Sequence, residues 1–114
     1  MRKIEREMAS AIQAGRSWKS GNTRVDVQDG STVVSLHGNE IARKTGSVLR
    51  LSSCGWRTVT TKSRINAVLR ALGFNGGVYQ TKRVWHLWQN PGSMQGRAVC
   101  PSMPFSDGME IYLA

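Results

Sequence analysis

The chain has 114 residues, and 16 lysines and arginines against 7 aspartates and glutamates give it a formal net charge of +9. This length predicts one domain over 1–114, with a helix and linker over 1–19 and a sheet-plus-helix core over 20–114. No apolar stretch approaches the roughly 18 residues of a membrane span, and the N-terminus alternates charges where a secretory signal is apolar, so we expect a soluble protein without a membrane partner.

The first elements follow from periodicity and turn chemistry. Residues 2–14 carry apolar side chains at helical spacing and precede Gly15, which predicts a short peripheral helix. Residues 23–28 and 31–37 alternate around Asp29-Gly30, a favoured hairpin turn. This register pairs Val25 with Val34, Val27 with Thr32 and Thr23 with Leu36, so that the apolar residues share one face.

The remaining segments extend this pattern. Strands are expected over 40–44, 47–52, 78–88 and 108–113, with a bend in the third at Lys82-Arg83. A helix is expected over 61–72, capped by Thr60 or Thr61. Residues 89–108 are expected to form an irregular loop. The predicted fold class is therefore α+β: an antiparallel sheet of about five strands, with the 61–72 helix packed on one face and the N-terminal helix at the periphery.

The charge is unevenly distributed along the chain. Between residues 41 and 106 there are ten cations and no carboxylate. A segment this one-sided repels itself unless an anion lies against it, and a nucleic-acid backbone is a common anion of that kind. An acidic protein is the competing partner.

The start of the 61–72 helix concentrates anion-binding groups. Hydroxyls occur at Thr58, Thr60, Thr61 and Ser63, beside the cations Arg57, Lys62 and Arg64. Backbone N–H groups at a helix N-terminus favour an anion, so this run predicts a phosphate contact. A helix cap alone needs only one of those hydroxyls.

Two other features suit nucleic acid. Lys62, Asn66 and Arg70 form a polar stripe opposite the apolar side of their helix, which fits either a phosphate backbone or a solvated face. The strand 79–88 interleaves cations with aromatic residues that stack on bases in some sheet proteins. Its alternation leaves two possibilities. Either Trp85 and Leu87 lie in the core and Trp88 faces out, or Trp88 lies in the core with Val84 and His86.

Catalytic chemistry is disfavoured. Acid–base catalysis needs two tunable groups close together, and neither His37 nor His86 has an identifiable partner. A zinc site built from these histidines with Cys54 and Cys100 lacks the closely spaced ligand pairs of structural zinc. We therefore expect no enzyme, no metal and no cofactor, and two reduced cysteines.

Four stretches carry a resemblance: Asn22–Val25, Leu36–Ala42, Gly55–Ala67 and Pro104–Met109. Together they resemble a family of small tailed-bacteriophage proteins, and the run Gly-Trp-x-Thr-x-Thr-Thr-Lys-x-Arg is the most specific part. The resemblance implies a phage protein made in the cytoplasm of an infected bacterium. It transfers no catalytic or binding residue.

The sequence thus predicts a basic, non-enzymatic phage protein that binds DNA or RNA. Two alternatives stay open, an early protein that inhibits a host or anti-phage defence protein, and a small accessory virion protein. The residues expected at the nucleic acid are Arg57, Thr60, Thr61, Lys62, Arg64, Arg70, Lys82, Arg83, Trp85 and Trp88.

Overall fold

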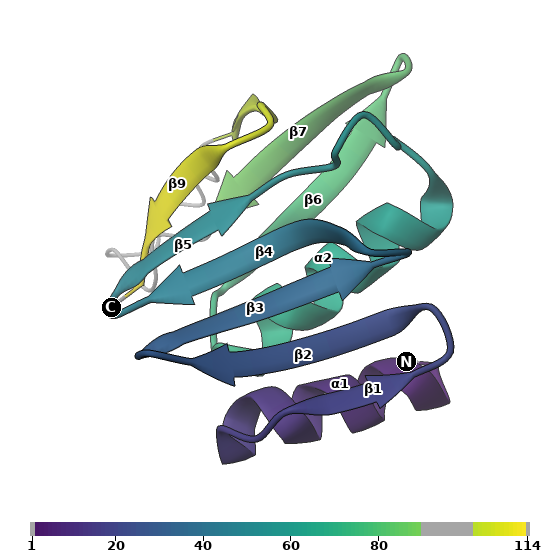
Figure 1. Cartoon of the computed structure of the whole chain (residues 1–114). Coiled ribbons are helices and arrows are strands. Elements are labelled where there is room, and N and C mark those ends of the chain that lie inside the picture. Colours follow the sequence, from purple (N-terminus) through teal and green to yellow (C-terminus); the bar gives the residue numbers. More distant parts are fainter. Residues whose placement is uncertain (1, 90–101, 114) are drawn as a thin grey trace.

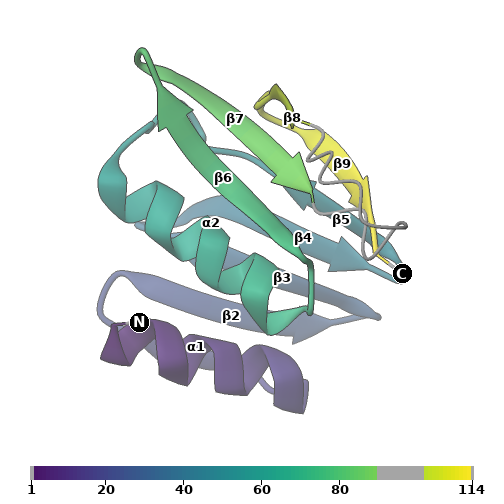
Figure 2. The same cartoon turned by 180° about the vertical axis from the view of Figure 1, so that it is seen from behind.

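The computed structural model describes residues 2–89 and 102–113. Within them, a six-stranded antiparallel sheet forms one layer, and two helices with a three-stranded antiparallel sheet lie on one of its faces (Figures 1 and 2). The strand order of the large sheet is β1-β2-β3-β4-β5-β9, and that of the small sheet is β6-β7-β8.

The bounds of the elements are as follows. The helices are α1 (Lys3–Ala14) and α2 (Val59–Ala71). The large sheet comprises β1 (Trp18–Ser20), β2 (Thr23–Gln28), β3 (Ser31–Leu36), β4 (Asn39–Thr45), β5 (Val48–Leu51) and β9 (Met109–Tyr112). The small sheet comprises β6 (Gly76–Thr81), β7 (Val84–Gln89) and β8 (Ser102–Pro104).

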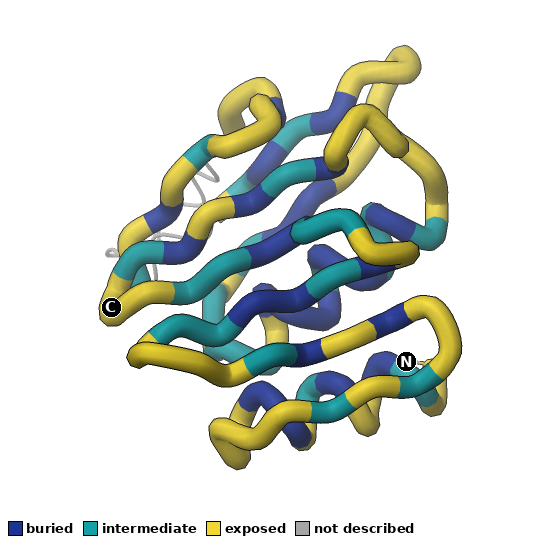
Figure 3. Tube along the Cα trace, in the orientation of Figure 1, coloured by how far each residue is buried: buried dark blue, intermediate teal, exposed yellow. Residues whose placement is uncertain are grey.

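The first hairpin has the register that its turn predicts. Thr23 lies opposite Leu36, Val25 opposite Val34 and Val27 opposite Thr32. Buried residues alternate with more exposed ones along β2 and β5 (Figure 3), because one face of the large sheet packs against the second layer and the other faces away from it.

The predicted α+β class with a single sheet of about five strands is wrong, since the described chain is mostly β and has nine strands in two sheets. Part of the expected linker forms β1, and part of the expected loop over 89–108 forms β8. The expected strand 78–88 is a hairpin that turns at Lys82-Arg83. Strand β9 pairs with β5 at the edge of the large sheet, so the β6–β7 hairpin does not add to that edge. The hairpin instead lies in the second layer, where β6 contacts α2.

The N-terminal helix is not peripheral. It packs against α2 and buries Met8, Ala11 and Ile12, and Met8 and Ile12 belong to one core cluster with residues of both sheets. Gly15 ends it in the left-handed conformation, as its sequence position predicts. Helix α2 begins earlier than expected, and its cap is Thr58, whose hydroxyl accepts a hydrogen bond from the Thr61 N–H.

The small sheet contributes its inner face to the same core. Val78, Trp85 and Leu87 are buried, whereas Trp88 is half-buried on the opposite face of β7. This decides between the two orientations that the sequence allows. Trp85 packs edge-on against Phe105, with ring centroids 5.4 Å apart.

A buried ion pair joins both helices to the large sheet. The Nη1 of Arg64 lies 2.8 Å from the Oε2 of Glu5, and the two side chains are only 5% and 4% exposed. Glu5 also accepts a hydrogen bond from the Ser63 hydroxyl, and the Nε of Arg64 donates to the hydroxyl of Thr23 on β2. Three elements therefore meet at one charged cluster.

We expect Arg64→Ala to lower the free energy of unfolding by about 3–5 kcal/mol, because it leaves the Glu5 carboxylate buried without its counter-charge. Urea denaturation followed by circular dichroism measures this. Arg24→Ala is the control, since it breaks an ion pair with Asp26 whose side chains are 59% and 32% exposed, and its cost should stay below about 1 kcal/mol. Equal losses in the two variants would contradict the structural role of the buried pair.

Asn66 holds the edge of the small sheet against α2. Its amide nitrogen donates to the Val78 carbonyl at 3.0 Å, and its amide oxygen accepts from the Val78 N–H at 2.7 Å. The side chain thus takes the place of a neighbouring strand. The contact is close, because a Cβ at Gly77 would lie 3.0 Å from the Asn66 oxygen.

Asn66→Ala should destabilise the protein by about 1–3 kcal/mol, since it leaves a half-buried N–H and C=O of β6 without partners. Asn66→Asp keeps the acceptor but sets a carboxylate against the Val78 carbonyl, so it should not restore stability. Thermal unfolding of both variants measures the effect, with the exposed Asn75→Ala as the control. Wild-type stability in Asn66→Asp would show that the donated bond contributes nothing.

Candidate functional site

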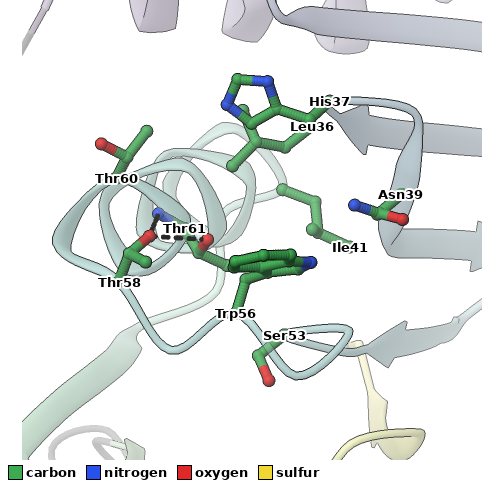
Figure 4. A pocket seen from close by; sticks show the side chains of 9 residues that line it. All are labelled: Leu36, His37, Asn39, Ile41, Ser53, Trp56, Thr58, Thr60 and Thr61. Carbon is green, nitrogen blue, oxygen red and sulfur yellow. Dashed lines mark hydrogen bonds between the residues drawn. The ribbon is translucent and has the colours of Figure 1, made fainter.

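A cavity of about 570 Å³ opens between the β3–β4 turn and the loop that enters α2 (Figure 4). Figure 4 shows Trp56 and His37 on opposite sides of it, with Leu36 and Ile41 between them. Trp56 is 63% exposed, whereas Leu36, Ile41 and Thr61 are buried. The full lining is Leu36, His37, Asn39, Ile41, Ser53, Trp56, Thr58, Thr60 and Thr61.

Two tight turns position the walls of this cavity. His37 (φ 53°) and Cys54 (φ 53°) adopt the left-handed conformation, and each precedes a glycine with positive φ. The Ser53 N–H and hydroxyl both donate to Asp107 Oδ1, at 2.7 and 2.8 Å, which fixes the start of the 53–58 loop. The exposed indole of Trp56 is therefore carried on an anchored segment.

Three of the four hydroxyls at the start of α2 have hydrogen-bond partners within the protein. Thr58 and Thr61 hydroxyls lie 3.0 Å apart, and Ser63 donates to Glu5. Among the described residues, only the Thr60 hydroxyl of this group has no hydrogen-bond partner. The predicted cluster of four hydroxyls around an anion is thus reduced to Thr60 at the mouth of the cavity.

The side chain of Arg57 is 38% exposed, but its guanidinium makes several contacts within the protein. Its guanidinium carbon lies 5.4 Å from the Trp85 ring centroid and 5.2 Å from that of Phe105. The Nε donates to the Ser53 hydroxyl at 3.3 Å, and Nη2 lies 3.7 Å from the Asp107 carboxylate. These contacts engage the guanidinium within the protein, and Arg57 lines neither the cavity nor the groove described below.

Asp107 has a lowered pKa as a result. Burial raises the pKa of its carboxyl, but hydrogen bonds from Ser53, the charge of Arg57 and a further hydrogen bond from Gly55 together lower it below the usual value. An unfolded aspartate has a pKa of about 3.9. Because the pKa of Asp107 is lower in the folded protein, its carboxylate stabilises the fold fully above this pH. The stabilisation is lost as the pH falls from there through the lower pKa of the folded state.

We expect the wild type to lose stability below about pH 4 more steeply than Asp107→Asn, which has no proton to take up at this position. Urea unfolding at pH 6 and pH 3 measures how much unfolding free energy each of the two proteins loses between these pH values. Asp29→Asn, in an exposed hairpin turn, is the matched control and should follow the wild type. Parallel curves for wild type and Asp107→Asn would refute a role for this carboxylate.

A cationic groove of about 550 Å³ lies between the start of α1 and the exposed side of α2. The predicted stripe of Lys62, Asn66 and Arg70 lines it, and Arg2 lies on its other side. Glu5 is the acidic group in its lining, and Arg64 already balances that charge. The groove is therefore net positive, with two cations on α2 and one at the residue that precedes α1.

The structure separates the other predicted residues. Arg64 and Trp85 are 4% and 1% exposed, so their side chains are unavailable to a ligand. Thr61 is 2% exposed and forms part of the cavity wall, with its hydroxyl 3.0 Å from that of Thr58. Lys82 and Arg83 are exposed in the β6–β7 turn, which lies at the same end of the molecule as the start of α2 (Figure 1).

Comparison with known proteins places the chain in a phage family. The family model of the Kyanoviridae Gp96 protein matches residues 1–112. The chain belongs to this cyanophage family. This confirms the resemblance to small tailed-phage proteins, and the match extends over the N-terminal helix and residues 89–103 of this Gp96-family chain as well. No curated protein and no solved structure matches it.

The described part of the Gp96-family chain contains neither a membrane-spanning helix nor a cluster of metal ligands. In residues 2–89 and 102–113, no helix is long and apolar enough to cross a membrane. The same residues bring no three His, Cys, Asp or Glu side chains together as a metal site; Cys100, one of the four zinc candidates, lies outside them.

Sequence reasoning missed the cavity and its main aromatic residue. Trp56 belongs to the most specific motif of the resemblance, but its exposure depends on the turn at Cys54 and the packing of the β3–β4 turn. The available signal was a tryptophan in a short glycine- and threonine-rich segment, between a strand and a helix cap.

Proposed function

We propose that this phage protein binds nucleic acid, with the phosphate backbone in the cationic groove between α1 and α2. Lys62 and Arg70 lie one helical turn on either side of Asn66 and face the same opening. Arg2 adds a third cation from the neighbouring helix end. Such a row on one surface matches the repeating charge of a nucleic-acid strand.

The observation that carries this proposal is the contrast between the two faces of the protein. On the outer face of the large sheet, Arg24 pairs with Asp26, Arg43 with Glu40 and Arg50 with Glu110. In the described part of the chain, no carboxylate lies within 4.0 Å of Lys62 or Arg70. The charges of Lys62 and Arg70 are thus available for an external anion to neutralise.

The β6–β7 turn supports an extended basic surface. Lys82 (φ 50°) and Arg83 (φ 64°) both occupy the left-handed region, which glycine or asparagine adopts at lower cost. The turn at Asp29-Gly30, by contrast, has glycine at its second position. Two cations at a strained and exposed tip fit a further phosphate contact, outside the groove.

We expect Lys62→Ala/Arg70→Ala to weaken nucleic-acid binding by about tenfold or more at low salt, because two phosphate contacts are lost. The slope of log K against log salt should fall by about 1.4 for a single strand or about 1.8 for duplex DNA. Fluorescence anisotropy with labelled DNA and RNA at several salt concentrations measures both.

The matched control is Arg24→Ala/Arg50→Ala, which removes the same charge from the outer face of the large sheet and should leave the slope unchanged. Equal weakening in the two double variants would indicate attraction by net charge alone and would reject the groove as the site. Absence of binding by the wild type at low salt would reject the proposed function itself.

A further inference from the structure

We infer that the Trp56 cavity takes one unpaired nucleobase, so that the protein selects single strands over duplexes. This inference rests on the proposed function and deepens it. The cavity, at about 570 Å³, has the size of a small-ligand site, and a large aromatic face lines it while remaining 63% exposed. An exposed tryptophan on an anchored loop provides a stacking surface for any base.

The chemistry of the lining suits a base rather than a phosphate. Leu36 and Ile41 form an apolar floor that accepts a flat ring. Around it, the Asn39 amide offers a donor and an acceptor, and the His37 ring and the Thr60 hydroxyl add further hydrogen-bonding groups for base edges. No carboxylate is among the residues that line the cavity, so nothing there repels a neighbouring phosphate.

The cavity and the cationic groove adjoin the same turn of α2. Thr58, Thr60 and Thr61 line the cavity, whereas Val59, Lys62 and Ser63 line the groove. A strand that crosses the first turn of α2 can therefore place a base in the cavity and its phosphates along the groove. A base inside a duplex has both faces stacked and its edge paired, so it enters only after it is unpaired at a cost.

Three variants test this inference, with labelled single-stranded and duplex oligonucleotides of one sequence as probes. Trp56→Ala should weaken single-strand binding about 5- to 150-fold, as expected for loss of one stacked base. Trp56→Phe keeps an aromatic face, so its affinity should stay within about threefold of the wild type, while the quenching of intrinsic tryptophan fluorescence by the strand decreases. Tyr112→Ala removes another exposed aromatic residue, 73% exposed on β9, and should change nothing.

The outcomes separate the two proposals. If no nucleic acid binds the wild type at low salt, the proposed function fails and the inference fails with it. If the wild type binds but Trp56→Ala has unchanged affinity, or duplex binds as tightly as single strand, the inference fails and the groove proposal stands. Tighter binding of a free nucleoside monophosphate than of the strand would also overturn it, because the cavity would then serve a small molecule.

Discussion

The carboxylate of Glu5 and the guanidinium of Arg64 meet 2.8 Å apart inside the protein, where α1, α2 and β2 come together. Removing two charges from water is expensive, so this arrangement persists only because Ser63 and Thr23 supply additional hydrogen bonds. The pair thereby sets the position of α1, which would otherwise contribute only an apolar stripe to the core. The second layer of the fold depends on it.

The same contact orients the surface of α2. With Arg64 directed inward, Lys62, Asn66 and Arg70 line the groove beside α1. The Asn66 side chain also forms two hydrogen bonds with the backbone of β6, and these hold the small sheet against the other side of the helix. Helix α2 is thus held from both sides, and its first turn separates the Trp56 cavity from the groove.

Charge distribution in the folded protein differs from what the linear sequence indicates. The acid-free segment 41–106 contains Arg43, Arg50 and Arg57, yet each of these pairs with an acid from outside the segment. Lys62 and Arg70 line the groove on the helical side, and Lys82 and Arg83 lie in the β6–β7 turn, without such a partner among the described residues. This distinction matters for function, because paired surface cations contribute little to the attraction of a polyanion.

By itself, the sequence determined the local features, which depend only on residues close together in the chain. Turn chemistry and alternation specify the register of the first hairpin, and apolar spacing with Gly15 places α1. Only the tertiary structure decided that Arg64 is buried and Trp56 exposed, and that the hairpin β6–β7 forms a second sheet. Glu5 and Arg64 are 59 positions apart, and local periodicity carries no information on which distant residues meet.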